Sequence, residues 1–295
     1  MDIQFFGGRG ASSGRKDSAV ASSAVEKEPV LGTEMKNVRP VDDYQRKVSN
    51  AFEERIKEIG KETGKKVTEG ELKEVETALQ ELMTSEDTHI GIRFASRHLK
   101  SILDDERFKS QFETGSSGGL LSTSVRARVE QDEMSYSKTS AAEKRPIYGM
   151  LFGYKKPSEA RVSAGAGSWY GDVVAIMKPT VKSHATVTGH DSLDKAGGLI
   201  PTPMLKPSRY MFDSVLHRGS ALKEAVTRVR EKKPLSVGMF DDYRYAEVQI
   251  HGGHAKVSNI QHLIFGMGAK LSKAQEKRLK SLGITWSREG DDTIH

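Results

Sequence analysis

The residues best suited to chemistry lie in the segment YAEVQIHGG, which spans residues 245–253. Its polar and apolar residues alternate, so a strand would place Tyr245, Glu247 and Gln249 on one face. A fixed carboxylate such as that of Glu247 stabilises positive charge developing on a reacting group, most strongly where water is excluded. The alternation equally fits an ordinary strand with one wet face, and the sequence leaves both interpretations open.

Arginines near two other segments indicate a second chemistry, the binding of anions. A guanidinium can hold phosphate oxygens through two parallel hydrogen bonds. Arg145 begins the segment RPIYGML, and Arg93 and Arg97 flank the end of HIGIRFAS. We therefore expect one or more of them to anchor a diphosphate, although an arginine before a proline is as often an ordinary charge at a strand edge.

Two further side chains are candidates for a pocket wall. Tyr148 follows Arg145 closely and can either stack on a flat ligand ring or pack in the core, and packing is the commoner role. Thr186 and Thr188 alternate in the segment HATVTG, so a strand would place both hydroxyls on one face.

A segment rich in glycine and serine, TGSSGG, occupies residues 114–119. The segment joins a strand and helix to the next strand within one domain, and glycine permits close approach of the backbone to a ligand, so we expect Gln111, Thr114, Gly115 and Ser116 to form the edge of a pocket. The charged residues that follow, from about 121 to 144, show no apolar period and predict a linker.

Metal chemistry is only weakly indicated. The motif HGGH holds His251 and His254, but its spacing fixes no third ligand. The absence of cysteine excludes disulfides, zinc–thiolate sites and cysteine nucleophiles. We therefore predict no metal site.

The elements that must position these residues follow from apolar periodicity and capping signals. Thr68 and Glu71 have the spacing of a capping box, and Gly283 stands where a helix would end. The resulting helices are predicted over residues 42–63, 69–83, 97–112, 220–231 and 272–282. Strands are predicted over 89–96 and 145–153, within 170–189, and in two or three pieces between 243 and 266.

Helices followed by strands mixed with helices predict an α+β fold. Residues 1–40, rich in glycine, serine and charge, predict a flexible arm; residues 41–85 a helical extension; and residues 86–295 the α+β domain. No apolar run is long enough to span a membrane, so we expect no membrane partner. The formal net charge of +6 favours anionic partners without identifying one.

From about His89 onward, four ordered motifs resemble the bacterial family known as domain of unknown function 3626. The motifs are FKSQFETGSSGG, RPIYGML, YGDVVAIMKPTVKSHATVTGHDSL and YAEVQIHGG. The chain departs from the family at Ala95, where members usually carry histidine, and at Gly118, where they tend to carry asparagine. The family name itself implies no activity.

The segments GDVVAIMKPTVKSHATVT and YAEVQIHGG also resemble the central strands of mono-ADP-ribosyltransferase toxins. That resemblance implies an ADP-ribosyltransferase-like mixed β core, with NAD as substrate and a macromolecule of the host, most simply a protein, as acceptor. Glu247 would be the catalytic acid, while the first acid of the toxin pair falls on Tyr245. The residues that would bind NAD are Arg97, Arg145, Tyr148, Gln111, Thr114, Gly115, Ser116 and Thr188.

The start of the chain, MDIQFFGGRGASSG, resembles the N-terminus of phage head-associated proteins. This implies capsid or portal proteins as partners and a location in the virion or the host cytoplasm. A basic segment near the C-terminus would allow weak, nonspecific DNA contact through phosphates; its residues are Lys270, Lys273, Lys277, Arg278 and Lys280. The alternative function is a non-catalytic minor head or ejection protein that retains the fold.

Overall fold

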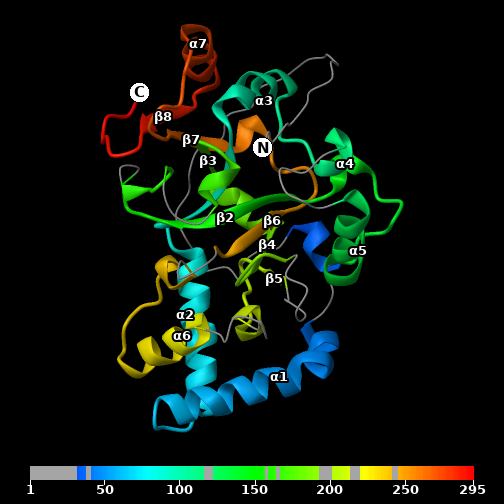
Figure 1. Cartoon of the computed structure of the whole chain (residues 1–295), viewed down its shortest axis with the longest axis vertical. Coiled ribbons are helices and arrows are strands. Elements are labelled where there is room, and N and C mark those ends of the chain that lie inside the picture. The colour runs from blue at the N-terminus through cyan, green and yellow to red at the C-terminus, as the bar shows by residue number, and fades with distance from the viewer. Residues whose placement is uncertain are drawn as a thin grey trace, which may run out of the picture.

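The computed structural model of the chain contains an eight-stranded sheet in the middle of the molecule (Figure 1). The strand order is β5-β4-β6-β2-β1-β3-β7-β8, and all neighbours are antiparallel except β7 and β8. The structure describes residues 32–37, 41–115, 122–156, 159–163, 167–192, 201–212, 220–240 and 245–295. The strands are β1 (Thr88–Phe94), β2 (Ile147–Gly153), β3 (Val173–Met177), β4 (Ala185–Thr188), β5 (Thr202–Pro203), β6 (Glu247–Ile250), β7 (Ile260–Phe265) and β8 (Thr285–Arg288).

Helices and sheet together confirm the α+β class. The α-helices are α1 (Val41–Glu62), α2 (Glu69–Thr84), α3 (Leu99–Asp105), α4 (Gln111–Thr114), α5 (Thr123–Met134), α6 (Ser220–Arg230) and α7 (Lys273–Leu282). Four of them, α1, α2, α6 and α7, match the predicted helices to within one residue at each end. The capping box of Thr68 and Glu71 and the left-handed Gly283 are also present as predicted.

Two predictions about the segment after β1 are wrong. The single helix expected over residues 97–112 is broken into α3 and α4, because the chain between them pairs with a distant segment: Phe108 N donates to Ala255 O at 2.9 Å. The linker expected over 121–144 contains the 12-residue helix α5. Its buried residues, Arg126, Glu130 and Met134, are two charges and one methionine, so no apolar period marked it.

The end of the predicted arm is held against the sheet. Residues 1–31 and 38–40 lie outside the described residues, but Thr33–Asn37 forms a 3-10 helix. Gly32 N donates to Ser183 O at 2.7 Å, and Met35 is buried. This stretch therefore docks beside the 3-10 helix Pro179–His184, which leads into β4.

The two faces of the sheet differ in chemistry. One face packs against α1, α2 and α6 in a single apolar core, so the helices of residues 41–85 share their core with the sheet. The other face carries a smaller apolar cluster on β2, β3 and β7, and on β4 and β6 it carries polar side chains. Helix α5 covers this polar region through contacts of Arg126 and Glu130 with Tyr148.

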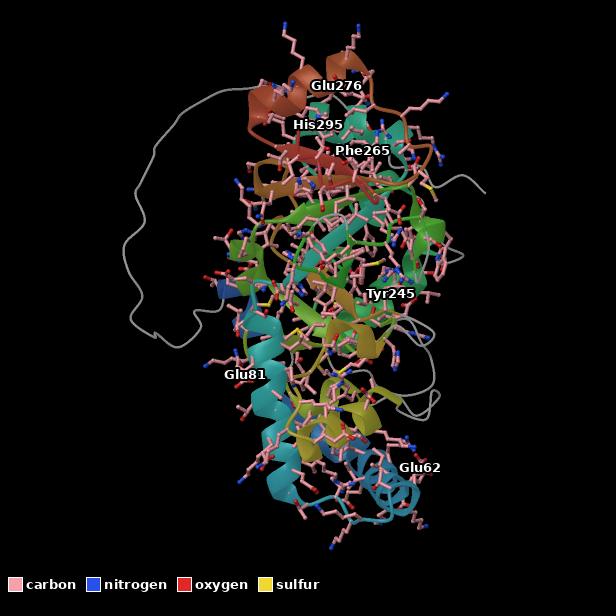
Figure 2. All side chains as sticks on the ribbon, turned by 90° about the vertical axis from the view of Figure 1, so that its left-hand side faces the viewer. Glu62, Glu81, Tyr245, Phe265, Glu276 and His295 are labelled. Atoms are coloured by element: carbon pink, nitrogen blue, oxygen red, sulfur yellow. The ribbon has the colours of Figure 1, made fainter. Side chains whose placement is uncertain are left out.

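The molecule is elongated. Helices α1, α2 and α6 gather at one end, and α7 with β8 at the other (Figure 1). In the view turned by 90°, Tyr245 lies between these ends, with Glu62 of α1 beyond it on one side and Glu276 of α7 on the other (Figure 2). Within the described part of the chain, no helix combines the length and the apolar character that a membrane span requires.

Close packing of β1 against β2 generates the first prediction. A Cβ at Gly149 would lie 2.7 Å from the backbone oxygen of Gly91, which cannot swing away as a side chain can. We expect Gly149→Ala to lower the free energy of unfolding by at least about 2 kcal/mol in urea titrations, because overpacking forces the backbone to shift.

Gly70→Ala is the matched control. The added Cβ would meet only Thr68 Oγ1, at 3.8 Å, and alanine favours the helix by up to about 1 kcal/mol. Equal stability of Gly149→Ala and the wild type would contradict the close approach of the two strands.

Candidate functional site

Glu247 occupies the centre of the polar face. Strand β6 lies between β4 and β2, and Glu247 is flanked by Thr188 on one side and Met150 on the other. Its side chain is only 3% exposed. Its Oε1 accepts hydrogen bonds from Gln249 Nε2 at 2.8 Å and from Ser192 N at 3.3 Å.

The environment of Glu247 favours its neutral form. Burial and the nearby carboxylate of Asp191 raise the pKa of Glu247 to about 8, although Arg126 and the two hydrogen bonds oppose the rise. At neutral pH the carboxyl therefore carries a proton. An acid with its pKa shifted towards the operating pH by burial and a specific charge is a typical feature of functional sites.

Arg126 of α5 is the second unusual group in this layer. Its guanidinium stacks on the ring of Tyr148, 3.9 Å from the centroid, and the residue is 9% exposed. Its Nε and Nη1 have no hydrogen-bond partner among the described residues. Because buried donors without partners are costly, a guanidinium with two unused N–H groups is suited to an anionic ligand. Arg126 is not among the predicted site residues, and in the sequence only its four-residue spacing to Glu130 indicates a shared helix face.

Arg145, by contrast, is fully engaged within the protein. Its Nη1 donates to Glu130 Oε2 at 2.7 Å, and its Nη2 donates to the carbonyl of Ser137 at 3.0 Å. Tyr148 donates its hydroxyl proton to the other carboxylate oxygen of Glu130 at 3.0 Å. The guanidinium of Arg145 also lies over the ring of Phe112, 4.0 Å from the centroid. Arg145 and Tyr148 thus position α4 and α5, and the geometry does not favour Arg145 as an anchor for NAD.

A chain of hydrogen bonds continues from Glu247 towards the end of the strand. Gln249 Nε2 bonds both Glu247 and Thr188 Oγ1, while Thr186 Oγ1 donates to Gln249 Oε1 at 2.7 Å. Thr186 Oγ1 also lies 2.8 Å from His251 Nε2, and the other ring nitrogen of His251 lies 2.7 Å from the hydroxyl of Tyr136. Burial lowers the pKa of His251 to about 3, so its ring is neutral.

The predicted pocket loop has a local structural role instead. Gln111, Thr114 and Gly115 belong to α4 and its cap: Thr114 Oγ1 donates to Ser110 O at 3.2 Å, and Gly115 has a φ of +72°. Ser116 lies outside the described residues. Since Gly115 closes the helical turn with its N–H on Gln111 O, its glycine is explained by that turn alone.

Arg97 lies in a different place, a cleft of about 410 Å³ at the end of β1. Trp169 and Met267 line the same cleft and are 62% and 80% exposed. Tyr170, another lining residue, has its hydroxyl 3.3 Å from that of Tyr245. Tyr245 lies two residues before Glu247, the first residue of β6, so this pair of tyrosines connects the cleft to the segment that leads into Glu247. Arg93 lies nearby but donates to the carbonyls of Val162 and Arg161.

The buried pair of Glu130 and Arg145 generates the second prediction. Both side chains are at most 3% exposed, so Glu130→Gln would leave a buried guanidinium without its counter-charge. We expect a loss of about 3–5 kcal/mol in the free energy of unfolding, measured by urea titration.

The exposed pair of Lys100 and Asp104 supplies the control, because its side chains are 77% and 62% exposed. Asp104→Asn should cost about 0–1 kcal/mol. Replacing Glu130 and Arg145 together by leucine and methionine should recover part of the loss, since the guanidinium of Arg145 is removed with its partner, while Tyr148 still loses its acceptor. A similar small cost for Glu130→Gln and Asp104→Asn would contradict the buried pair.

The third prediction concerns the proton on Glu247. Between pH 4.5 and about 8 the folded chain holds a proton that the unfolded chain has lost, so stability falls as pH rises through this window. Glu247→Gln retains a carbonyl oxygen for Gln249 and Ser192 but cannot ionise. Its free energy of unfolding relative to the wild type should therefore increase with pH, by at most about 1.4 kcal/mol per unit.

Urea unfolding of both proteins between pH 5 and pH 9 measures this difference. Glu81→Gln serves as the control, because it makes the same substitution at an exposed position on α2. A stability difference for Glu247→Gln that is independent of pH would show that the carboxyl titrates normally.

Two phage proteins are similar to this chain. It is 27% identical over 217 residues to the Gene 2 protein of Mycobacterium phage L5, an alignment that covers 72% of this chain and 76% of that protein. It is 26% identical over 219 residues to the Gene 2 protein of Mycobacterium phage D29, covering 72% and 77%. No protein-family model matches the chain. The similarity indicates a phage origin, and the resemblances to the two bacterial families stay predictions.

Proposed function

We propose that this phage-encoded chain binds NAD and transfers ADP-ribose to a host macromolecule. One observation carries the proposal: a buried carboxyl, Glu247, shares a polar layer on the sheet with Arg126, whose Nε and Nη1 have no hydrogen-bond partner within the described parts of the chain. Arg126 acts on Glu247 electrostatically, and Tyr148 lies beneath its guanidinium. NAD cleavage needs a carboxylate near the ribose and a cationic group near the diphosphate, so the two groups must lie close together.

The roles follow from the charges of the reaction. The bond from ribose C1′ to the nicotinamide nitrogen breaks, its electron pair leaves with nicotinamide, and positive charge spreads over C1′ and the ring oxygen. Ionised Glu247 stabilises that charge, while Arg126 holds a phosphate oxygen. A nucleophile of the acceptor then bonds to C1′ and loses its proton. Because burial raises the pKa of Glu247 to about 8, its ionised form becomes more abundant as the pH rises towards that value, so the rate should rise with pH.

The adjacent cleft supplies the remaining contacts. The exposed indole of Trp169 offers a flat apolar surface for the adenine ring, and Arg97 lies on the wall of the same cleft. Tyr170 lines the cleft, and its hydroxyl contacts that of Tyr245, which lies two residues before Glu247. Because Glu247 is 3% exposed, catalysis requires that the side chains above it move when NAD enters.

The fourth prediction is a transfer assay. Wild-type protein, incubated at pH 7 to 9 with adenylate-labelled NAD and a lysate of the host bacterium, should release nicotinamide and label a macromolecule. Glu247→Gln should lose at least about 100-fold in rate, since removing one stabilising group from such a site costs on this order. Arg126→Gln should bind NAD more weakly.

Glu81→Gln, on the exposed side of α2, is the matched control and should keep full activity. Urea unfolding of each variant separates loss of activity from loss of fold. If the wild type releases no nicotinamide and labels nothing across this pH range, the enzymatic proposal fails.

A second candidate function is a non-catalytic minor head or ejection protein. Two features favour it. Glu247 is buried, and Tyr245 stands at the position where the toxins carry the first acid of their pair. Its contact with capsid or portal proteins would use residues 1–31, which lie outside the described residues. The exposed basic side chains of Lys273 and Lys277 on α7 would touch DNA only weakly. Mass spectrometry of purified particles, with and without residues 2–14 of the chain, tests this candidate.

A further inference from the structure

We propose that Glu34, His184 and His254 form a binding site for one divalent transition-metal ion of the zinc class. One potential ligand atom from each residue lies within 4.8 Å of the other two. Two imidazoles and one carboxylate, with a fourth position left for water, are a donor set that zinc takes in proteins. This site shares no residue with the proposed NAD site, so the two proposals stand or fall separately.

Three segments far apart in the chain build the cluster. Glu34 comes from the 3-10 helix Thr33–Asn37, His184 from the end of the 3-10 helix before β4, and His254 from the turn after β6. Backbone hydrogen bonds fix all three: Gly32 N donates to Ser183 O at 2.7 Å, and His251 N donates to His184 O at 2.9 Å. Asn259 Nδ2 donates to His254 O at 2.8 Å and holds the turn. The ligand atoms therefore come together on ordered backbone.

The distances suit a small metal ion. Ligands about 2.0–2.1 Å from a tetrahedral zinc lie about 3.3 Å from one another. Glu34 Oε1 and His254 Nε2 are 3.4 Å apart, which matches this spacing. Glu34 Oε1 also contacts His184 Nδ1 directly, and the imidazoles of His184 and His254 stack at 3.5 Å between centroids. A metal ion would replace the Glu34–His184 hydrogen bond, and the stacked rings would have to turn so that a nitrogen of each faces the ion.

Two glycines leave room for the carboxylate and the imidazole. Gly252 has a φ of +62°, and a Cβ there would lie 2.9 Å from Glu34 Oε1. A Cβ at Gly32 would collide with the ring of His184. The backbone on both sides of the cluster is therefore shaped around these side chains.

The cluster is partly open to solvent. The side chains are 24–32% exposed, so water can occupy the fourth position.

His251, the other histidine of the HGGH motif, is not a ligand of this site. Both its ring nitrogens are engaged, one with Tyr136 and one with Thr186. The rival account is that Glu34, His184 and His254 form only a hydrogen-bonded clasp. The two accounts differ in one measurable property, the binding of a metal ion.

Metal binding by the untagged full-length protein is the test. After treatment with a chelator, the protein is titrated with Zn²⁺ by calorimetry and with Co²⁺ by visible absorption. We expect one ion per chain and the absorption bands of four-coordinate cobalt. His184→Gln and His254→Gln should each weaken binding at least about 100-fold, because losing a ligand costs more than losing a group that merely orients one, which costs about 10–100-fold.

His295→Gln is the matched control, because His295 is an exposed histidine at the C-terminus and lies outside the cluster. Circular dichroism and urea unfolding in chelator should show that all variants fold like the wild type. Undetectable binding by the wild type, or equal binding by the wild type and both cluster variants, would overturn the metal site and leave the hydrogen-bonded clasp.

Discussion

The structure depends on how charge is buried between α5 and the sheet. Glu130 is fully buried, and an uncompensated carboxylate there would cost several kcal/mol. Arg145 and Tyr148 satisfy its two oxygens from the start of β2, while the guanidinium of Arg145 also rests on Phe112 of α4. One ion pair therefore fixes the position of two helices over the polar face.

The other two ionisable groups of this layer, Glu247 and Arg126, are less fully paired than Glu130 and Arg145. Burial raises the pKa of Glu247, so its neutral form is favoured even though Arg126 acts against this shift. The Nε and Nη1 groups of Arg126 have no hydrogen-bond partner among the described residues. Native interiors rarely leave polar groups unsatisfied, and exceptions gather at functional sites. An anion at Arg126 would satisfy its donors, although a nearby anion would also raise the pKa of Glu247 further. Ligand binding and ionisation of Glu247 therefore oppose each other unless the substrate's own positive charge, on the nicotinamide ring, lies against the acid.

Elements with a strong local signal are predictable from the sequence, whereas those that tertiary contacts determine are not. Helices α1, α2, α6 and α7 carry apolar stripes and caps, so their bounds follow from the sequence. Helix α5 buries Arg126 and Glu130, which look like solvent-facing charges until their partners from β2 are known. Strand alternation predicts that Glu247 shares a face with Tyr245 and Gln249, but it does not indicate whether that face is exposed to solvent or covered. For the same reason Arg145 looked like an anion anchor, whereas its anion is Glu130 of its own chain.

The histidine cluster shows the same limit over a longer distance. Spacing within HGGH pairs His254 with His251, yet the turn built on Gly252 and Gly253 points the two rings to different partners. His254 meets Glu34 and His184, which lie 150 residues apart in the chain. His251 instead joins the hydrogen bonds that lead through Thr186 and Gln249 to Glu247. One turn thus contributes to both polar sites, so a change in the cluster would act on the Glu247 layer through the backbone of this turn rather than through a shared ligand.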